Sequence, residues 1–184
     1  MFKIPTMKQN IPIFVILVTS ILFFLSCKSS QEPENRGFIV KIGDDCPDFE
    51  MVLINDSVVK MSDLKGKVVM LQFTASWCGV CREEMPHIEN EIWQPLQSKG
   101  LVVIGIDRDE PVETVRKFAA GMKISYPLSL DPGAQIFSRF AVKESGVTRN
   151  VIIDKNGKIA YLTRFFNMKE FGLMKAKIEE LLQQ

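Results

Sequence analysis

The sequence predicts an α/β domain in which a mixed central sheet is flanked by helices. Two apolar runs rich in β-branched residues, 67–74 and 101–107, are continuous, as expected of strands that are covered on both faces. Each run is followed by a segment with helical periodicity. Near the C-terminus, Asn156-Gly157 joins two further short apolar runs, which is typical of a β-hairpin. Strands that alternate with helices and then pair as a hairpin indicate a layered α/β architecture.

The elements can be placed in order along the chain. An N-terminal β-hairpin is expected from the runs 49–54 and 58–61, because Asn55-Asp56-Ser57 between them favours a turn. After the strand 67–74, a helix is expected over about 78–93, kinked at Pro86. The remaining predicted elements are a strand over 101–107, a helix over 111–122, a strand over 126–130, a helix from Asp131 through Phe140, strands over 150–154 and 158–162, and a helix over about 168–182.

The most informative motif is Trp77-Cys78-Gly79-Val80-Cys81, which lies where the strand 67–74 leads into a helix. A thiol at the N-terminus of a helix faces unpaired backbone N–H groups and the positive end of the helix dipole, and both favour the thiolate. A second cysteine almost one turn later can close a disulfide with the first. This spacing and position predict thiol–disulfide exchange at Cys78 and Cys81.

The other cysteines and the composition narrow the possibilities. The domain after the N-terminal segment contains Cys46, Cys78 and Cys81, an odd number that argues against a scaffold of structural disulfides. Zinc usually takes four ligands, and the chain has a single Cys-x-x-Cys pair, so a metal site is not expected. The net charge is +1 and no basic stripe is present, so nucleic acid is not an expected partner.

The N-terminus is typical of an export signal of the lipoprotein type. Lys3 and Lys8 precede an apolar run, 11–26, that is shorter than the roughly 20 residues of a comfortable bilayer span. Cys27 ends this run, which favours a signal peptide over 1–26 and a lipidated Cys27; the alternatives are an ordinary signal peptide or an uncleaved anchor. The segment 27–42 is expected to be a flexible tether, and one domain is expected over 43–184.

Several motifs resemble the thioredoxin-like fold, and within it the TlpA/ResA group of membrane-tethered thiol–disulfide oxidoreductases. They are the opening segment 43–49, the segment 73–81 with its Cys-x-x-Cys pair, its continuation Arg82-Glu83-Glu84-Met85-Pro86, and the segment 151–159. The resemblance extends from about Gly43 to the C-terminus. The opening segment is shared with peroxiredoxins.

The resemblance implies roles for particular residues. Cys78 would attack a partner disulfide, and Cys81 would resolve the resulting mixed disulfide. Glu84, one helical turn after Cys81, would move protons, since a carboxyl group in a partly buried pocket has a raised pKa. The alternative for Glu84 is a solvated helix residue. Trp77 is expected either to present an apolar surface to partners or to belong to the core.

The chain departs from the family pattern at two places. The family usually has a cis-proline facing the cysteines, and that position holds Thr148, whose preceding peptide is expected to be trans. Arg149 beside it could stabilise a thiolate or pair with a surface acid. We therefore take Thr148 and Arg149 as candidate substrate-binding residues. The spacer Gly79-Val80 contains no proline, and Gln72 stands where thioredoxins carry a buried acid.

Two other residues are expected to have structural roles. His87, the single histidine, is expected to be structural or solvated rather than catalytic. Cys46 is expected to behave as a small buried hydrophobe, with a transient third thiol as the alternative.

The sequence thus predicts a lipid-anchored thiol–disulfide oxidoreductase of the cell envelope that faces the periplasm or exterior and reduces disulfides in exported proteins. Its redox group would be the Cys78–Cys81 pair itself, because no haem, flavin or nucleotide motif is visible. A membrane thiol carrier would supply electrons. The alternatives are a peroxiredoxin-like thiol peroxidase and a redox-inactive binding module. Thr74 stands four residues before Cys78 rather than three, which argues against the peroxidase.

Overall fold

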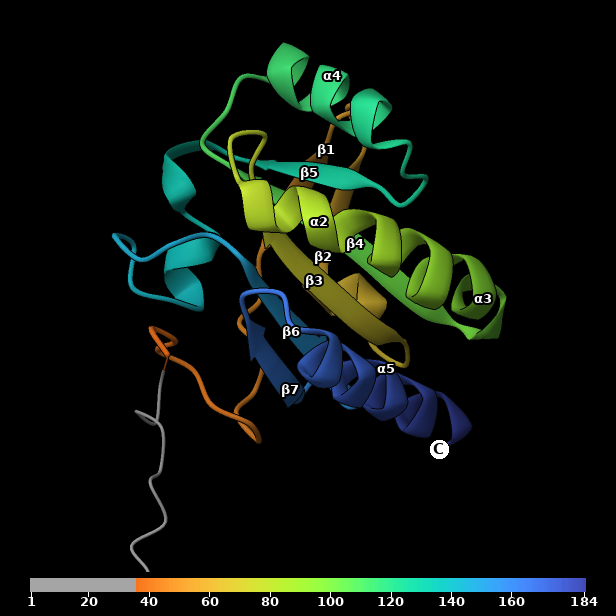
Figure 1. The fold of residues 1–184 in the computed structure, drawn as a ribbon. Helices are drawn as coiled ribbons and strands as arrows, with labels where there is room; N and C mark the ends of the chain where they lie inside the picture. The colour runs from red at the N-terminus through yellow and green to blue at the C-terminus, as the bar shows by residue number, and fades with distance from the viewer. Residues whose placement is uncertain (1–35) are drawn as a thin grey trace, which may run out of the picture. The chain divides into compact units, whose positions relative to one another are not determined.

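A seven-stranded mixed sheet organises residues 36–184, the part of the chain that the computed structural model describes (Figure 1). The strand order is β2-β1-β5-β4-β3-β6-β7. The strands are β1 Glu50–Leu53, β2 Val58–Lys60, β3 Val68–Thr74, β4 Leu101–Arg108, β5 Leu128–Asp131, β6 Arg149–Ile153 and β7 Ile159–Arg164. The helical segments are η1 Met61–Leu64, α2 Gly79–His87, η2 Ile88–Trp93, α3 Gln94–Leu96, η3 Gln97–Lys99, α4 Val112–Met122, η4 Pro132–Ala134, η5 Phe137–Arg139 and α5 Met168–Gln183.

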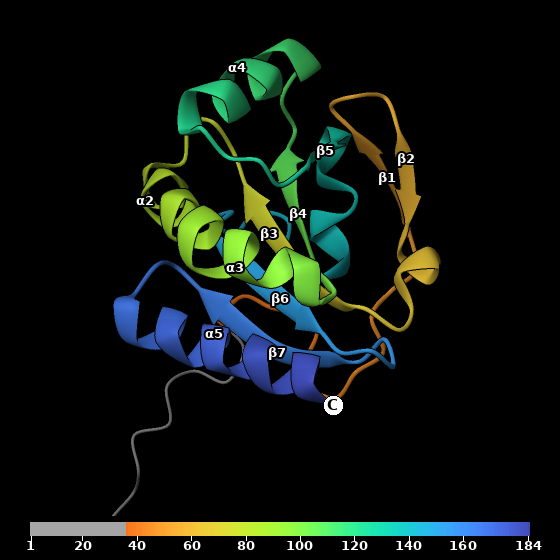
Figure 2. The ribbon, with the colours of Figure 1, turned by 90° about the vertical axis from the view of Figure 1, so that its right-hand side faces the viewer.

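The strand that leads to the cysteines, β3, lies in the interior of the sheet and is buried along its whole length. It pairs in parallel with β4 and antiparallel with β6, so the expected mixed sheet is confirmed. The hairpin β1–β2 joins the sheet through antiparallel pairing of β1 with β5. Figure 2 shows this hairpin beyond β5, at the edge of the sheet, where it forms the expected N-terminal extension.

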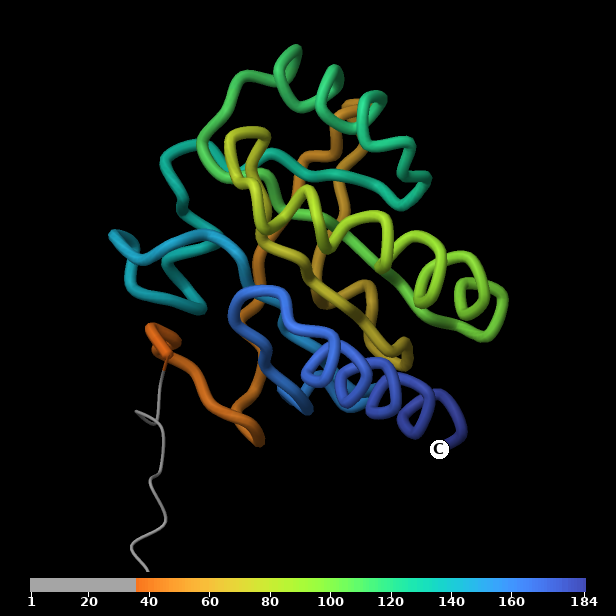
Figure 3. The backbone as a smooth tube through the Cα atoms, viewed as in Figure 1, coloured from red at the N-terminus to blue at the C-terminus, as the bar shows by residue number. Residues whose placement is uncertain are grey.

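Alternation along β3 divides the interior into two cores. Val68 and Met70 belong to the core under α2, α4 and α5, whereas Leu71 and Phe73 belong to the core on the opposite face. The path of the chain in Figure 3 shows α2 and α5 side by side across the same face of the sheet. The residues of α5 that point into this core are Phe171, Met174, Ile178 and Leu181, the apolar face that the sequence predicts.

Among the described residues, no α-helix covers the opposite face of the sheet. The prediction of a helix from Asp131 through Phe140 is wrong. Two separate 3-10 turns, η4 and η5, occupy this stretch. Gly133 and Ala134 have positive φ angles of 69° and 54°, which interrupt a right-handed helix. The carboxylate of Asp131 accepts hydrogen bonds from the backbone N–H of Ile136 at 2.7 Å and of Phe137 at 2.9 Å, so it supplies the backbone partners that a helix would otherwise provide.

The long helical segment after the cysteines changes from α-helical to π-helical hydrogen bonding. Pro86 lies in α2 and has no N–H to donate, and the π-helical segment η2 begins two residues later. Pro95 lies at the start of the short α3, where a missing backbone N–H is tolerated. The expected helix over about 78–93 is therefore present, but proline is accommodated by wider backbone turns.

The described part of the chain begins before the predicted domain boundary. Phe38 is buried, and the backbone N–H of Ile39 donates to the carbonyl of Phe140 at 2.9 Å. Residues 36–42 therefore pack on the domain instead of forming the end of a tether. The predicted signal peptide 1–26, the lipidation site Cys27 and the rest of the tether lie outside the described residues. Within 36–184, no helix combines the length and the apolar character needed to cross a bilayer.

Candidate active site

Cys78 and Cys81 are joined in a disulfide at the start of α2, with their Cα atoms 5.3 Å apart. Cys78 is the N-cap residue of this helix, and its Sγ accepts the backbone N–H of Cys81 at 3.2 Å. The exposed fraction is 7% for Cys78 and 0% for Cys81. Cys78 is therefore the more exposed of the two cysteines, and the unpaired N–H groups of the helix stabilise negative charge on its sulfur.

The loop before Cys78 is fixed by polar contacts to Ser76. The carboxylate of Glu110 accepts the backbone N–H of Ser76 at 2.5 Å and its hydroxyl at 2.6 Å. The guanidinium of Arg82 donates to the carbonyl of Ser76 at 2.9 Å. Trp77, between Ser76 and Cys78, remains 63% exposed, so its side chain is a surface residue beside the disulfide and not part of the core.

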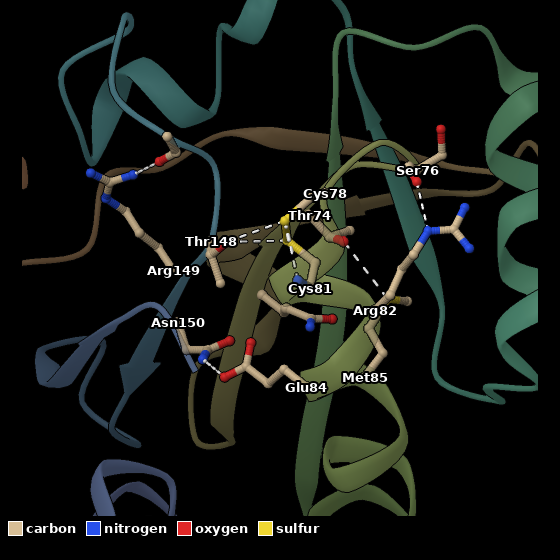
Figure 4. Close-up of a disulfide and its surroundings, with 12 residues drawn as sticks. Thr74, Ser76, Cys78, Cys81, Arg82, Glu84, Met85, Thr148, Arg149 and Asn150 are labelled. Carbon is tan, nitrogen blue, oxygen red and sulfur yellow. Dashed lines mark hydrogen bonds between the residues drawn. A yellow bond between two sulfur atoms is a disulfide. The ribbon is translucent and has the colours of Figure 1, made fainter. Parts of the chain in front are cut away.

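Thr148 lies against both sulfurs. Its hydroxyl is 3.2 Å from Sγ of Cys78 and 3.4 Å from Sγ of Cys81, and Figure 4 shows both contacts. No peptide bond in residues 36–184 is cis, as the sequence predicts for the bond before Thr148. The position facing the cysteines therefore holds a buried hydroxyl, which contacts the reacting atoms themselves.

Arg149 does not reach the sulfurs, contrary to the expectation that it could stabilise a thiolate or bind substrate. Neighbouring side chains of a strand point to opposite faces, so Thr148 and Asn150 turn toward α2 while Arg149 turns away, as Figure 4 shows. The Arg149 guanidinium is fully buried and donates to the backbone carbonyls of Gly146 and Arg36. Burial is the largest cause that lowers its pKa, to about 10, followed by nearby arginines.

Glu84 is buried under the disulfide and is 2% exposed. Its carboxylate accepts a hydrogen bond of 2.6 Å from the amide of Asn150, and the same amide donates to the hydroxyl of Thr163 at 2.8 Å. Burial raises the pKa of Glu84 to about 7, although the amides of Asn150 and Gln72 partly offset this effect. A carboxyl group with this pKa exchanges protons readily at neutral pH, which suits general acid–base chemistry.

Gln72 is a further buried polar residue on the α2 side of the sheet, beside Glu84 and Asn150. Its side-chain carbonyl accepts the hydroxyl of Tyr126 at 2.7 Å, and its amide is among the groups that lower the pKa of Glu84. Gln72 lies in β3, six residues before Cys78, where thioredoxins carry a buried acid. Its amide cannot take up a proton. Glu84, whose pKa is raised to about 7, is the neighbouring buried group that can take up a proton near neutral pH.

A second buried acid, Asp107, was missed by the sequence reasoning. It ends the apolar part of β4, pairs in register with Thr74 of β3 and is 0% exposed. Neither of its carboxylate oxygens has a hydrogen-bond partner among the described residues. Burial raises its pKa to about 8, and the charge of Glu110 adds to the effect. An acid at the C-terminal end of a buried parallel strand, next to the strand that carries the cysteine loop, was the available signal.

We expect Asp107→Asn to stabilise the protein at alkaline pH. A carboxyl group whose pKa is raised on folding stabilises the native state below its unfolded value, and that contribution is lost as the pH rises through about 8. The uncharged amide removes this loss, so the gain in the free energy of unfolding should be at least about 1 kcal/mol larger at pH 9 than at pH 4. Urea unfolding at both values of pH measures this, with the exposed Glu144→Gln as control. An equal change at both would contradict the assignment.

Cys46 and His87 have surroundings that fit structural roles. Burial raises the pKa of the half-buried Cys46 thiol to about 12, and its Sγ donates to the carbonyl of Pro47 at 3.5 Å. His87 is 2.7 Å from Glu91 and packs against the rings of Phe166 and Phe171. In residues 36–184, no three or more His, Cys, Asp or Glu side chains gather in a group able to hold a metal ion.

A family model described as AhpC/TSA matches residues 42–162, most of the described domain. The chain belongs to the AhpC/TSA family. Among curated relatives of this AhpC/TSA protein, a thiol–disulfide oxidoreductase ResA of Bacillus cereus is 30% identical over 158 residues, which cover 83% of this chain and 87% of the relative. The resemblance to the TlpA/ResA group stated from the sequence is thereby confirmed.

Solved structures support the same assignment for the AhpC/TSA chain. The solution structure of a proposed protein disulfide isomerase from Bacteroides thetaiotaomicron is 52% identical, has a TM-score of 0.79 and covers 82% of this chain and 95% of that chain. The crystal structure of a proposed thiol:disulfide interchange protein DsbE from Chlorobium tepidum is 30% identical, with a TM-score of 0.70, and covers 78% and 99%. This AhpC/TSA protein has a thioredoxin-like fold and is a thiol–disulfide oxidoreductase.

Proposed function

We propose that this oxidoreductase reduces disulfides in exported proteins, with Cys78 as the nucleophile, Cys81 as the resolving thiol and Glu84 as the proton acceptor. The observation that supports it most directly is the Cys78–Cys81 disulfide at the N-terminus of α2, with the more exposed cysteine at the N-cap. No further cofactor enters this proposal, because the cysteine pair carries both electrons.

The catalytic cycle proposed here has two exchanges. The Cys78 thiolate attacks one sulfur of a substrate disulfide; a Cys78–substrate bond forms, and the other substrate sulfur leaves as a thiolate. Cys81 then gives its proton to Glu84 and attacks Sγ of Cys78, so that the Cys78–Cys81 bond forms and the substrate leaves as its second thiolate. Two electrons have passed to the substrate, and a dithiol donor must return two electrons to the cysteine pair.

Glu84 is placed to serve the second exchange. It lies three residues after Cys81 on the same helix, so both side chains are on one face of α2, and both are buried. A base that is close to half ionised at neutral pH can accept the Cys81 proton and return it later. Asn150 fixes the orientation of the carboxylate through its 2.6 Å hydrogen bond.

The proposed location is the outer side of a membrane, with the domain held by lipid at Cys27. An apolar run that ends at Cys27 and a polar segment after it support this proposal. A membrane thiol carrier is the proposed electron donor, and protein disulfides are the substrates. A labelled fatty acid should be incorporated into the wild-type protein and not into Cys27→Ser, and equal labelling of the two proteins would contradict the lipid anchor.

We expect the reduction potential of the pair to be closer to the roughly −270 mV of thioredoxin than to the roughly −120 mV of DsbA. Equilibration with glutathione or dithiothreitol buffers and alkylation of the free thiols measures it. The reduced protein should also reduce insulin disulfides with multiple turnovers when dithiothreitol is supplied. A potential near that of DsbA, or peroxide oxidation much faster than that of a free thiol, would contradict the proposed direction or reaction.

A further inference from the structure

The hydroxyl of Thr148 is the one side-chain group within hydrogen-bond distance of both active-site sulfurs among the described residues. In the disulfide neither sulfur carries a proton, so the hydroxyl is the donor in these contacts. Its distances to the two Sγ atoms, 3.2 and 3.4 Å, differ little. A small rotation about the side-chain bond of Thr148 therefore directs its single proton to either sulfur.

The hydroxyl acts in a protected environment. Thr148 is 4% exposed, so few water molecules compete with it for the sulfurs. A hydrogen bond to an ionised acceptor is stronger than one to a neutral acceptor, and exclusion of water increases the difference. A thiolate beside Thr148 therefore gains more from the hydroxyl than the disulfide or the thiol does.

The backbone of Thr148 is held so that the hydroxyl stays at the sulfurs. Its carbonyl accepts the backbone N–H of Phe165 at 3.3 Å and the guanidinium of Arg164 at 3.2 Å. Arg164 in turn stacks over the ring of Phe165, with 3.8 Å from the guanidinium carbon to the ring centroid. These contacts place Thr148 before substrate arrives, which is the arrangement expected of a group that stabilises developing charge.

We propose that Thr148 is a catalytic hydrogen-bond donor that serves the two sulfurs in turn, donating to Cys78 in the reduced protein and to Cys81 during resolution. This inference rests on the proposed function, since it assigns a role within the same two exchanges. Cys78 already accepts the backbone N–H of Cys81, whereas Thr148 supplies the donor to Cys81. Because a hydroxyl has one proton, the donor follows the negative charge from the first sulfur to the second.

The test compares Thr148→Val, which keeps the branched shape without the hydroxyl, with Thr148→Ser, which keeps the hydroxyl. We expect Thr148→Val to reduce the ionisation constant of the Cys78 thiol by about tenfold or more, and Thr148→Ser to stay within about threefold of the wild type. The thiolate absorbance and the rate of alkylation as functions of pH measure this constant. Circular dichroism shows whether each variant is folded, and Thr148→Ala replaces Thr148→Val if the latter does not fold.

Resolution is measured separately, with a mixed disulfide formed between Cys78 and a small aromatic thiol. Thr148→Val should slow the release of that thiol by about tenfold at a fixed pH, whereas Thr148→Ser should release it at nearly the wild-type rate. A folded Thr148→Val protein with wild-type ionisation and wild-type release would overturn the role of Thr148. Failure of the proposed function itself would appear differently, as a wild-type protein that does not form the mixed disulfide through Cys78.

Discussion

Replacing Cys78 with serine is expected to lower insulin-disulfide reduction to the background set by dithiothreitol alone. Serine has nearly the same shape, but its hydroxyl is not ionised at neutral pH and cannot form the mixed disulfide. The helix N-terminus would remain intact, since a serine oxygen is a good N-cap acceptor. The loss therefore reports chemistry and not folding, and the turbidity of precipitating insulin chains measures it.

Two further substitutions serve as controls for Cys78→Ser. Cys81→Ser should still attack a substrate but not release it, so a mixed disulfide should accumulate and be visible by non-reducing electrophoresis. Cys46→Ser should leave the rate unchanged, because that thiol has its pKa raised to about 12 and is not ionised at neutral pH. A Cys78→Ser protein that reduces insulin as fast as the wild type would refute the nucleophile assignment.

Glu84→Gln is expected to slow resolution by about a hundredfold near neutral pH. The wild-type rate should rise with pH as the carboxyl group, with its pKa raised to about 7, loses its proton and becomes able to accept one from Cys81. Glutamine keeps the size and the hydrogen-bonding capacity, but it cannot accept the proton. The rise centred near pH 7 should therefore disappear in the variant when release of a thiol from the mixed disulfide is followed.

The same substitution, Glu84→Gln, is expected to slow resolution but to raise the free energy of unfolding. Because the pKa of Glu84 is about 7 in the folded protein and 4.5 as an ordinary value, the folded state binds the extra proton between these two values of pH. The contribution of Glu84 to stability is present below about pH 4.5 and is lost as the pH rises through 7. We expect Glu84→Gln to be more stable than the wild type at pH 8, by up to about 3 kcal/mol, and to gain little at pH 4.

Glu83→Gln is the matched control, because Glu83 is the preceding residue on the same helix and its side chain is exposed. It should change neither the pH dependence of resolution nor the difference in stability between pH 4 and pH 8. If Glu83→Gln and Glu84→Gln behave alike, burial of Glu84 does not have the effect assigned to it.

Patterns that depend on local sequence predicted most of the fold. The continuous apolar runs became β3 and β4, and the turn at Asn156-Gly157 joins β6 to β7. The stretch after Asp131 failed because its structure depends on a contact that periodicity does not report: one carboxylate binds two backbone N–H groups five and six residues ahead. The apolar residues of this stretch are spaced as in a helix, but Gly133 and Ala134 have positive φ angles, so the chain forms turns there.

The site was predictable where spacing along one helix determines it, and less so where two strands meet. Cys81 and Glu84 lie one turn apart on one face of α2, and Cys78 is the N-cap residue of the same helix, so these positions follow from the helical repeat. The partner of Glu84, Asn150, comes from β6 and could not be inferred from the helix. Asp107 was missed for the same reason, since its burial depends on how β4 packs beside β3.

The alternation of Thr148, Arg149 and Asn150 limits how this segment can change during evolution. Substitutions that keep a hydroxyl at 148, a guanidinium at 149 and an amide at 150 leave the site in place. Deletion or insertion of one residue just before β6 would instead exchange its faces, bringing the guanidinium toward the sulfurs and carrying the hydroxyl and the amide to the opposite core. We therefore expect homologues to differ in length within the loop 142–146, where the chain can absorb an extra or missing residue. We expect no insertion or deletion between Val147 and Asn150.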